Sequence, residues 1–100
     1  MKAIIIGTTQ CPFCVIAKEE AVKNGIEYEY KVIDRGESKE KLEEFGTPIT
    51  MEQAIEIVNR PFRTVPQIIV DGEYIGGCDD FLKFLERKNL DTSDFNDMSI

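Results

Sequence analysis

The sequence contains no histidine and only three cysteines among its 100 residues. One chain therefore cannot supply four cysteine and histidine ligands to a zinc ion. A cluster bridged between two chains remains open. Three cysteines are also too few for the disulfide framework of a small secreted domain.

Basic side chains are in the minority, with 12 lysines and arginines against 19 aspartates and glutamates. The net charge of −7 argues against a nucleic-acid partner, because phosphate contacts need clustered lysine and arginine. No apolar run approaches a membrane span, and the opening run of residues 3–7 is shorter than the apolar region of a signal peptide. We therefore expect a single domain that is not bound to a membrane and stays in the cytoplasm.

Two of the three cysteines form the pattern Cys11-Pro12-Phe13-Cys14, between an apolar strand-like run and a helix-like stretch. A cysteine at a helix N-terminus faces unpaired backbone N–H groups and the positive end of the helix dipole, so its thiolate is stabilised and its pKa falls. Only the thiolate attacks a disulfide. Cys14, about one helical turn later, can reach back to Cys11 and expel a bound partner.

The same pattern has two other interpretations. A structural disulfide would close so short a loop that it would remove little entropy from the unfolded chain. A metal site needs further ligands, and Cys78 is the only other cysteine. Redox chemistry is therefore the favoured interpretation.

Hydrophobic periodicity and turn residues predict four strands and four helices. Strands are expected at residues 2–7, 26–33, 67–70 and 73–75, and helices at 12–24, 37–45, 50–59 and from Asp79 or Asp80 to about Asn89. Val15, Ala21 and Val22 are predicted to form the apolar side of the first helix, and Asp71-Gly72 is a preferred hairpin turn. Thr50 and Gln53 have the spacing of a capping box.

These elements predict an α/β domain over residues 1–90, followed by a polar C-terminal tail at 91–100. The first two strands are joined by a helix and must be parallel, whereas the later hairpin adds an antiparallel pair. We expect a four-stranded mixed sheet flanked by helices.

Three motifs in this order resemble the glutaredoxins, which have the thioredoxin-like fold: Cys11-Pro12-Phe13-Cys14, Thr64-Val65-Pro66 and Gly76-Gly77-Cys78-Asp79-Asp80. The resemblance covers residues 1 to about 88, although the segment 35–61 is longer than in compact glutaredoxins. It implies that Cys11 is the nucleophile and Cys14 the resolving thiol of a glutathione-dependent disulfide oxidoreductase.

The resemblance also implies a glutathione site. Pro66 would follow a cis peptide bond, so that the backbone of Val65, next to Thr64, pairs with the cysteinyl part of glutathione. The alternative is that these residues merely begin a strand. Phe13 would form a flat apolar lid beside the sulfur.

The two ends of glutathione would be held separately. The γ-glutamyl end would bind Gly77, Cys78, Asp79 and Asp80, because a helix N-terminus attracts a carboxylate and an aspartate pairs with an ammonium group. These aspartates could instead only cap the helix. Arg63 is the first candidate to bind the glycyl carboxylate, and Gln53 is a weaker candidate contact.

Many glutaredoxins have a basic residue three positions before the nucleophile, where this chain has Thr8. Thiolate stabilisation would then depend more on the helix terminus. Cys78 is either an inert buried side chain or a secondary, regulatory thiol.

Together with the motifs, this resemblance implies a monomeric enzyme that reduces protein disulfides and protein–glutathione mixed disulfides, with glutathione as its reductant and no metal. Client proteins with disulfides are expected partners, and family likeness suggests ribonucleotide reductase among them. A thioredoxin-like reductant fed by a flavoprotein reductase is one alternative. A glutathione-ligated iron–sulfur scaffold is the other, and Pro12 disfavours it because family members with clusters usually have a small residue there.

Overall fold

The centre of the sheet is the apolar strand β1 (Lys2–Gly7), whose last three residues are all buried. It pairs in parallel with β2 (Glu27–Ile33) and antiparallel with β4 (Gln67–Val70). Its two faces pack in two separate apolar clusters, which is why its sequence is apolar almost throughout. The computed structural model describes residues 1–97, and the side chains of residues 1–88.

The hairpin and the crossover predicted from the sequence are both confirmed. β4 continues into β5 (Glu73–Gly76) through Asp71 and Gly72, which have φ angles of 50° and 84°. Positive φ at both central residues is the geometry of a type I′ turn, which explains the Asp-Gly pair. Helix α1 (Pro12–Lys23) makes the crossover from β1 to β2.

The predicted number of strands is wrong, because a short strand β3 (Thr47–Ile49) pairs in parallel with the edge of β2. The sheet therefore has five strands in the order β3-β2-β1-β4-β5. Three residues that include Pro48 give no strand signal in the sequence, since proline cannot donate to a ladder and is tolerated only at an edge. The strand exists because β2 offers it a partner.

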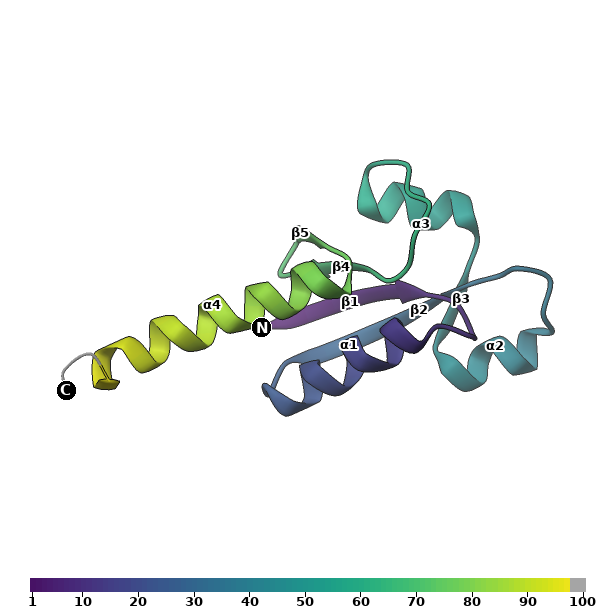
Figure 1. The fold of residues 1–100 in the computed structure, drawn as a ribbon. Helices are drawn as coiled ribbons and strands as arrows, with labels where there is room; N and C mark the ends of the chain where they lie inside the picture. Colours follow the sequence, from purple (N-terminus) through teal and green to yellow (C-terminus); the bar gives the residue numbers. More distant parts are fainter. Residues whose placement is uncertain (98–100) are drawn as a thin grey trace.

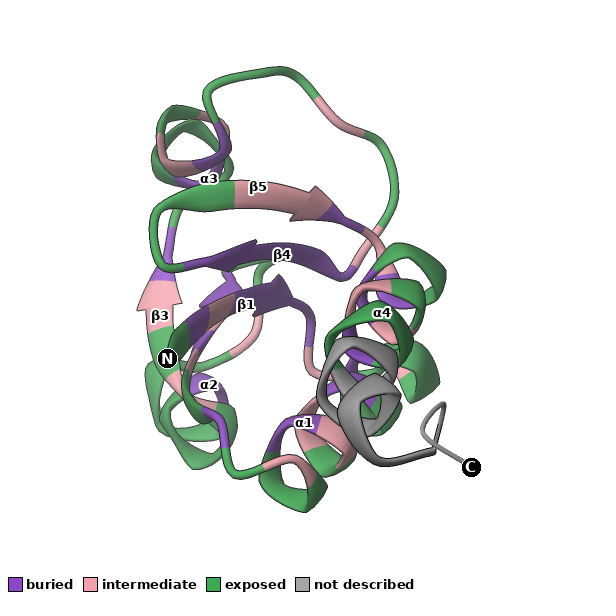
Figure 2. Ribbon diagram, turned by 90° about the vertical axis from the view of Figure 1, so that its left-hand side faces the viewer, coloured by how far each residue is buried: buried purple, intermediate pink, exposed green. Residues whose placement is uncertain are grey.

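The helices divide between the two faces of the sheet. Helix α1 and helix α4 (Cys78–Asp97) lie together over one face, where Ala17, Ala21, Phe81 and Leu85 pack on Ile5. Helix α3 (Met51–Val58) lies across the sheet from them, over a second apolar cluster (Figures 1 and 2). Helix α2 (Lys39–Phe45) lies beside β2 and β3 at the edge of the sheet.

The predicted inner face of α1 is wrong except for Ala21. Val15 and Val22 are exposed, and the buried residues of the helix are Cys14, Ala17 and Ala21. These small side chains let the helix axis approach the sheet and α4 closely, whereas β-branched side chains at the contact would hold it away.

Helix α4 also differs from the prediction at both ends. It begins at Cys78, so Gly77 and not an aspartate precedes the first turn. It continues past Asn89 to Asp97, because no glycine or proline interrupts that stretch. Most of the predicted tail is therefore helical, and residues 98–100 lie outside the described part of the chain. Within residues 1–97, no helix has both the length and the apolar character needed to cross a bilayer.

Candidate functional site

The two cysteines of the motif lie at the start of α1, as predicted. Cys11 is the N-cap residue, with extended φ and ψ of −145° and 98°, and Pro12 occupies the first helical position. The Cys11 Sγ accepts a hydrogen bond from the backbone N–H of Cys14 at 3.2 Å. The sulfur thus occupies the place of a capping oxygen, where the helix N-terminus stabilises negative charge.

The structure is that of the oxidised form, with a disulfide between Cys11 and Cys14 whose Cα atoms are 5.2 Å apart. The two sulfurs differ in access: Cys11 is half-buried, whereas Cys14 is only 1% exposed. An incoming thiolate can therefore reach Cys11 and is shielded from Cys14. This asymmetry agrees with Cys11 as nucleophile and Cys14 as resolving thiol.

The loop before Cys11 is held by two hydrogen bonds from other elements. The Tyr30 hydroxyl on β2 donates to the backbone carbonyl of Thr8 at 2.7 Å. The Thr9 hydroxyl donates to the Glu37 carboxylate at 2.6 Å, and this bond is the main cause that lowers the pKa of Glu37. Thr8, at the position where many glutaredoxins have a basic residue, is neutral and buried.

The Val65–Pro66 peptide bond is cis, the geometry that the resemblance implies. Beyond it, Gln67 is buried and ties the loop to the sheet. Its Nε2 donates to the Thr64 carbonyl at 2.8 Å, and its Oε1 accepts from the Tyr74 hydroxyl at 2.6 Å. The guanidinium of Arg60 lies 4.0 Å from the centre of the Tyr74 ring.

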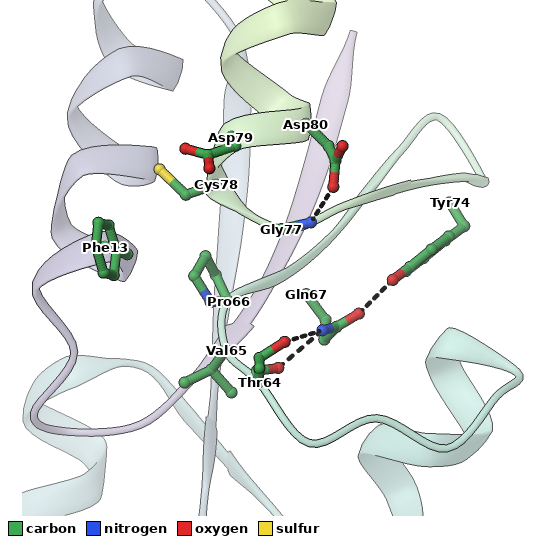
Figure 3. Close-up of a pocket in the computed structure, with 10 residues that line it drawn as sticks. All are labelled: Phe13, Thr64, Val65, Pro66, Gln67, Tyr74, Gly77, Cys78, Asp79 and Asp80. Carbon is green, nitrogen blue, oxygen red and sulfur yellow. Dashed lines mark hydrogen bonds between the residues drawn. The ribbon is translucent and has the colours of Figure 1, made fainter.

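A cavity of about 310 Å³ opens between this loop and the starts of α1 and α4 (Figure 3). It brings together most of the binding residues predicted from the sequence. It is lined by Phe13, Thr64, Val65, Pro66, Gln67, Tyr74, Gly77, Cys78, Asp79 and Asp80. Gln67 and Tyr74 were not predicted. The sequence signals that could have identified them are the polar character of Gln67, directly after Pro66, and the presence of a tyrosine in the second strand of the hairpin.

The two aspartates at the start of α4 have different surroundings. The Asp80 carboxylate accepts a hydrogen bond from the Gly77 N–H at 3.1 Å and so caps the helix from its third position. Asp79 is exposed and lines the cavity without that bond. Both carboxylates thus line the cavity, and Asp80 also fixes the helix start.

Cys78 lines the same cavity and is buried. Burial raises the pKa of its thiol, and the negative charges of Asp79 and Glu20 raise it further. A thiol with a raised pKa holds little thiolate at neutral pH and is a poor nucleophile. In this structure Cys78 therefore forms part of the cavity wall as a buried thiol.

Two predicted binding residues lie outside this cavity. Gln53 is engaged in the predicted capping box, where its side chain accepts from the Thr50 N–H at 2.9 Å. Arg63 lines a neighbouring cavity of about 250 Å³, together with Arg35. Val65 lines both cavities.

The comparisons with known proteins agree with this geometry. A family model described as Glutaredoxin matches residues 3–75. Glutaredoxin 1 of Escherichia coli is 37% identical over 95 residues, which cover 91% of this chain and 99% of the relative. The glutaredoxin of Haemophilus influenzae is 37% identical over 91 residues, covering 88% and 94%.

The fold comparison leads to the same family. The solved structure of reduced Escherichia coli glutaredoxin has a TM-score of 0.62 to this chain at 32% identity, and the match covers 91% of this chain and 99% of that one. A half-buried cysteine that caps α1, with its partner sulfur buried behind it, is the redox pair such a protein needs. The chain therefore belongs to the glutaredoxin family, the thiol–disulfide oxidoreductases that use glutathione.

Proposed function

We propose that this glutaredoxin reduces protein disulfides and protein–glutathione mixed disulfides by successive thiol–disulfide exchanges. The Cys11 thiolate attacks a sulfur of the client, forms a mixed disulfide and expels the other sulfur as a thiolate. When the client is a protein disulfide, Cys14 then attacks the Cys11 sulfur of the mixed disulfide and releases the second client sulfur, which leaves the client as a dithiol. Two glutathione molecules restore the Cys11 and Cys14 thiols and leave as oxidised glutathione.

The observation that carries the proposal is the difference in access between the two sulfurs. Cys11 is half-buried at a helix N-terminus, where negative charge is stabilised, and it can meet a bulky client. Cys14 is 1% exposed and within disulfide distance of Cys11. A sulfur in that position can resolve a mixed disulfide but cannot begin one.

Glutathione fits the cavity beside Cys11 in an extended form. Its cysteinyl part would pair with the backbone of Val65, next to the cis bond, in strand fashion. Its γ-glutamyl carboxylate would face the first-turn N–H groups of α4, and its ammonium group would face Asp79.

The opposite end of glutathione carries the glycyl carboxylate. A ligand that crosses Val65 from the first cavity enters the second one, where Arg63 and Arg35 supply two guanidinium groups. A planar guanidinium binds a carboxylate through two parallel hydrogen bonds. We therefore propose that Arg63 and Arg35 bind the glycyl carboxylate. Gln53 instead caps α3.

We propose that the reaction takes place in the cytoplasm. A C-x-x-C pair that cycles between dithiol and disulfide suits the reducing cytoplasm, where structural disulfides are rare. We propose that the protein acts there as a monomer. Family likeness makes ribonucleotide reductase a candidate client among disulfide proteins.

The test compares two sources of electrons. One reaction contains NADPH, glutathione and glutathione reductase, and the other contains NADPH and thioredoxin reductase. We expect sustained NADPH oxidation with a glutathionylated protein only in the first reaction. Turnover in the second reaction alone would support the thioredoxin-like alternative. Visible charge-transfer absorption in freshly purified protein, with no turnover in either reaction, would support the iron–sulfur scaffold.

A further inference from the structure

The last residue of β1, Gly7, lies beneath two side chains that come from different elements. A Cβ atom at Gly7 would overlap both the Sγ of Cys14 on α1 and the hydroxyl oxygen of Tyr30 on β2. Both atoms border the position that this Cβ would take, so they face the same small space. The missing side chain at Gly7 therefore gives the resolving sulfur and the phenol hydroxyl a shared space inside the protein.

Water has almost no access to this space. Cys14 is 1% exposed and Tyr30 is 5% exposed. The Tyr30 hydroxyl donates to the Thr8 carbonyl at 2.7 Å, and the Nζ of Lys18, one turn after Cys14 on α1, lies 4.2 Å from the centre of the ring. Burial raises the pKa of Tyr30 to about 12. At neutral pH the hydroxyl therefore keeps its proton and can act as a hydrogen-bond donor.

A thiolate released in this space would need a donor. When a glutathione thiolate attacks Cys11, a new sulfur–sulfur bond forms between them and the bond from Cys11 to Cys14 breaks. The electron pair of that bond stays on the Cys14 Sγ as a negative charge, until the sulfur takes up one proton from solution. A buried charge without a hydrogen-bond partner is costly, and bulk water cannot supply the partner here.

We propose that Tyr30 is a positioning residue for the resolving sulfur: its hydroxyl turns from the Thr8 carbonyl to the Cys14 thiolate and donates a hydrogen bond to it. The inference deepens the proposed function and rests on it. The same bond acts in the reverse direction, when the Cys14 thiolate attacks the mixed disulfide at Cys11. Deglutathionylation by Cys11 alone places no charge on Cys14, so Tyr30 should not affect it through this bond.

If the Tyr30 hydroxyl has only a structural role, its removal should change the reaction rates in a different way. If the hydroxyl only anchors the loop before Cys11 through Thr8, its loss would disturb the nucleophile, and every reaction of Cys11 would slow together. If it stabilises the Cys14 thiolate, only the reactions that use both sulfurs would slow. The ratio of the two rates separates these roles.

The experiment uses Tyr30→Phe, which keeps the ring and removes the hydroxyl, in the wild-type chain and in Cys14→Ser. We expect Tyr30→Phe to slow the opening of the Cys11–Cys14 disulfide by glutathione about tenfold, the effect of one hydrogen bond to a charged sulfur. In Cys14→Ser, the same substitution should slow deglutathionylation far less, because only the bond to the Thr8 carbonyl is lost there. Tyr28→Phe, on the same strand but with an exposed side chain, is the matched control and should change neither rate.

Equal slowing of both reactions, or no slowing of disulfide opening, would overturn the inference. Absence of deglutathionylation by Cys14→Ser itself would instead count against the proposed function. A measurement on the wild-type chain does not depend on how well Tyr30→Phe folds: the ¹³Cζ resonance of Tyr30 should shift as Cys14 ionises in the reduced protein. A resonance that does not respond to this ionisation would also overturn the inference.

Discussion

The Tyr74 hydroxyl on β5 donates a 2.6 Å hydrogen bond to the side-chain carbonyl of Gln67, the residue after the cis-proline. The amide nitrogen of Gln67 in turn donates to the Thr64 carbonyl at 2.8 Å, so Gln67 links the hairpin to the loop before the cis-proline (Figure 3). The hairpin thereby fixes the strand-like segment on which glutathione is proposed to lie. Positioning of this kind lets a ligand bind without first ordering a loop.

The first prediction tests this chain of hydrogen bonds. Tyr74→Phe removes the hydroxyl and leaves the buried Gln67 carbonyl without its donor, which should cost about 1 kcal/mol and lower the melting temperature by about 4 to 8 °C. The looser loop should also raise the KM for glutathione more than it changes kcat. Thermal melts and glutathione titrations of turnover measure both effects. A lower melting temperature with an unchanged KM would mean that the bond stabilises the fold only.

The second prediction concerns alkaline pH. The pKa of Tyr30 is raised to about 12, above its ordinary value near 10, so the folded protein holds this proton more tightly than the unfolded chain does. The contribution to stability is therefore complete below pH 10 and is lost as the pH rises from 10 to 12. Phenolate absorbance should show a step near pH 12 that Tyr30→Phe lacks. An identical titration of the two proteins would contradict the burial of the hydroxyl.

The third prediction separates the two aspartates of α4. Asp79→Asn should weaken the use of glutathione roughly 5- to 150-fold, because it removes one charge-assisted contact worth about 1 to 3 kcal/mol. Asp80→Asn should leave glutathione use nearly unchanged. It should lower the melting temperature by about 2 to 8 °C, since it weakens the bond from the Gly77 N–H and the favourable charge at the helix start. The reverse pattern would assign the γ-glutamyl contact to Asp80.

Local sequence signals predicted the elements that depend on near neighbours. The Asp71-Gly72 turn, the Thr50 and Gln53 capping box and the cysteine that caps α1 all involve residues within four positions of each other. Their chemistry is complete in a short segment, so the sequence is sufficient to identify them.

Features that depend on distant partners could not be predicted in this way. β3 is a strand only because β2 lies beside it, and α1 buries its small residues only because α4 and the sheet approach it closely. In the site, Gln67 looks like an ordinary first strand residue until Tyr74 is placed opposite it. Tyr30 follows the alternation of a half-buried strand, and nothing in that pattern indicates the sulfur of Cys14 next to its hydroxyl.

Two single substitutions in one assay distinguish Cys11 as the nucleophile from Cys14 as the resolving thiol. Glutathione-driven turnover is measured for Cys11→Ser and Cys14→Ser with a glutathionylated protein and with a protein disulfide. We expect Cys11→Ser to lose both activities, whereas Cys14→Ser should keep deglutathionylation and lose protein-disulfide reduction. Equal loss of deglutathionylation in the two variants would contradict this assignment.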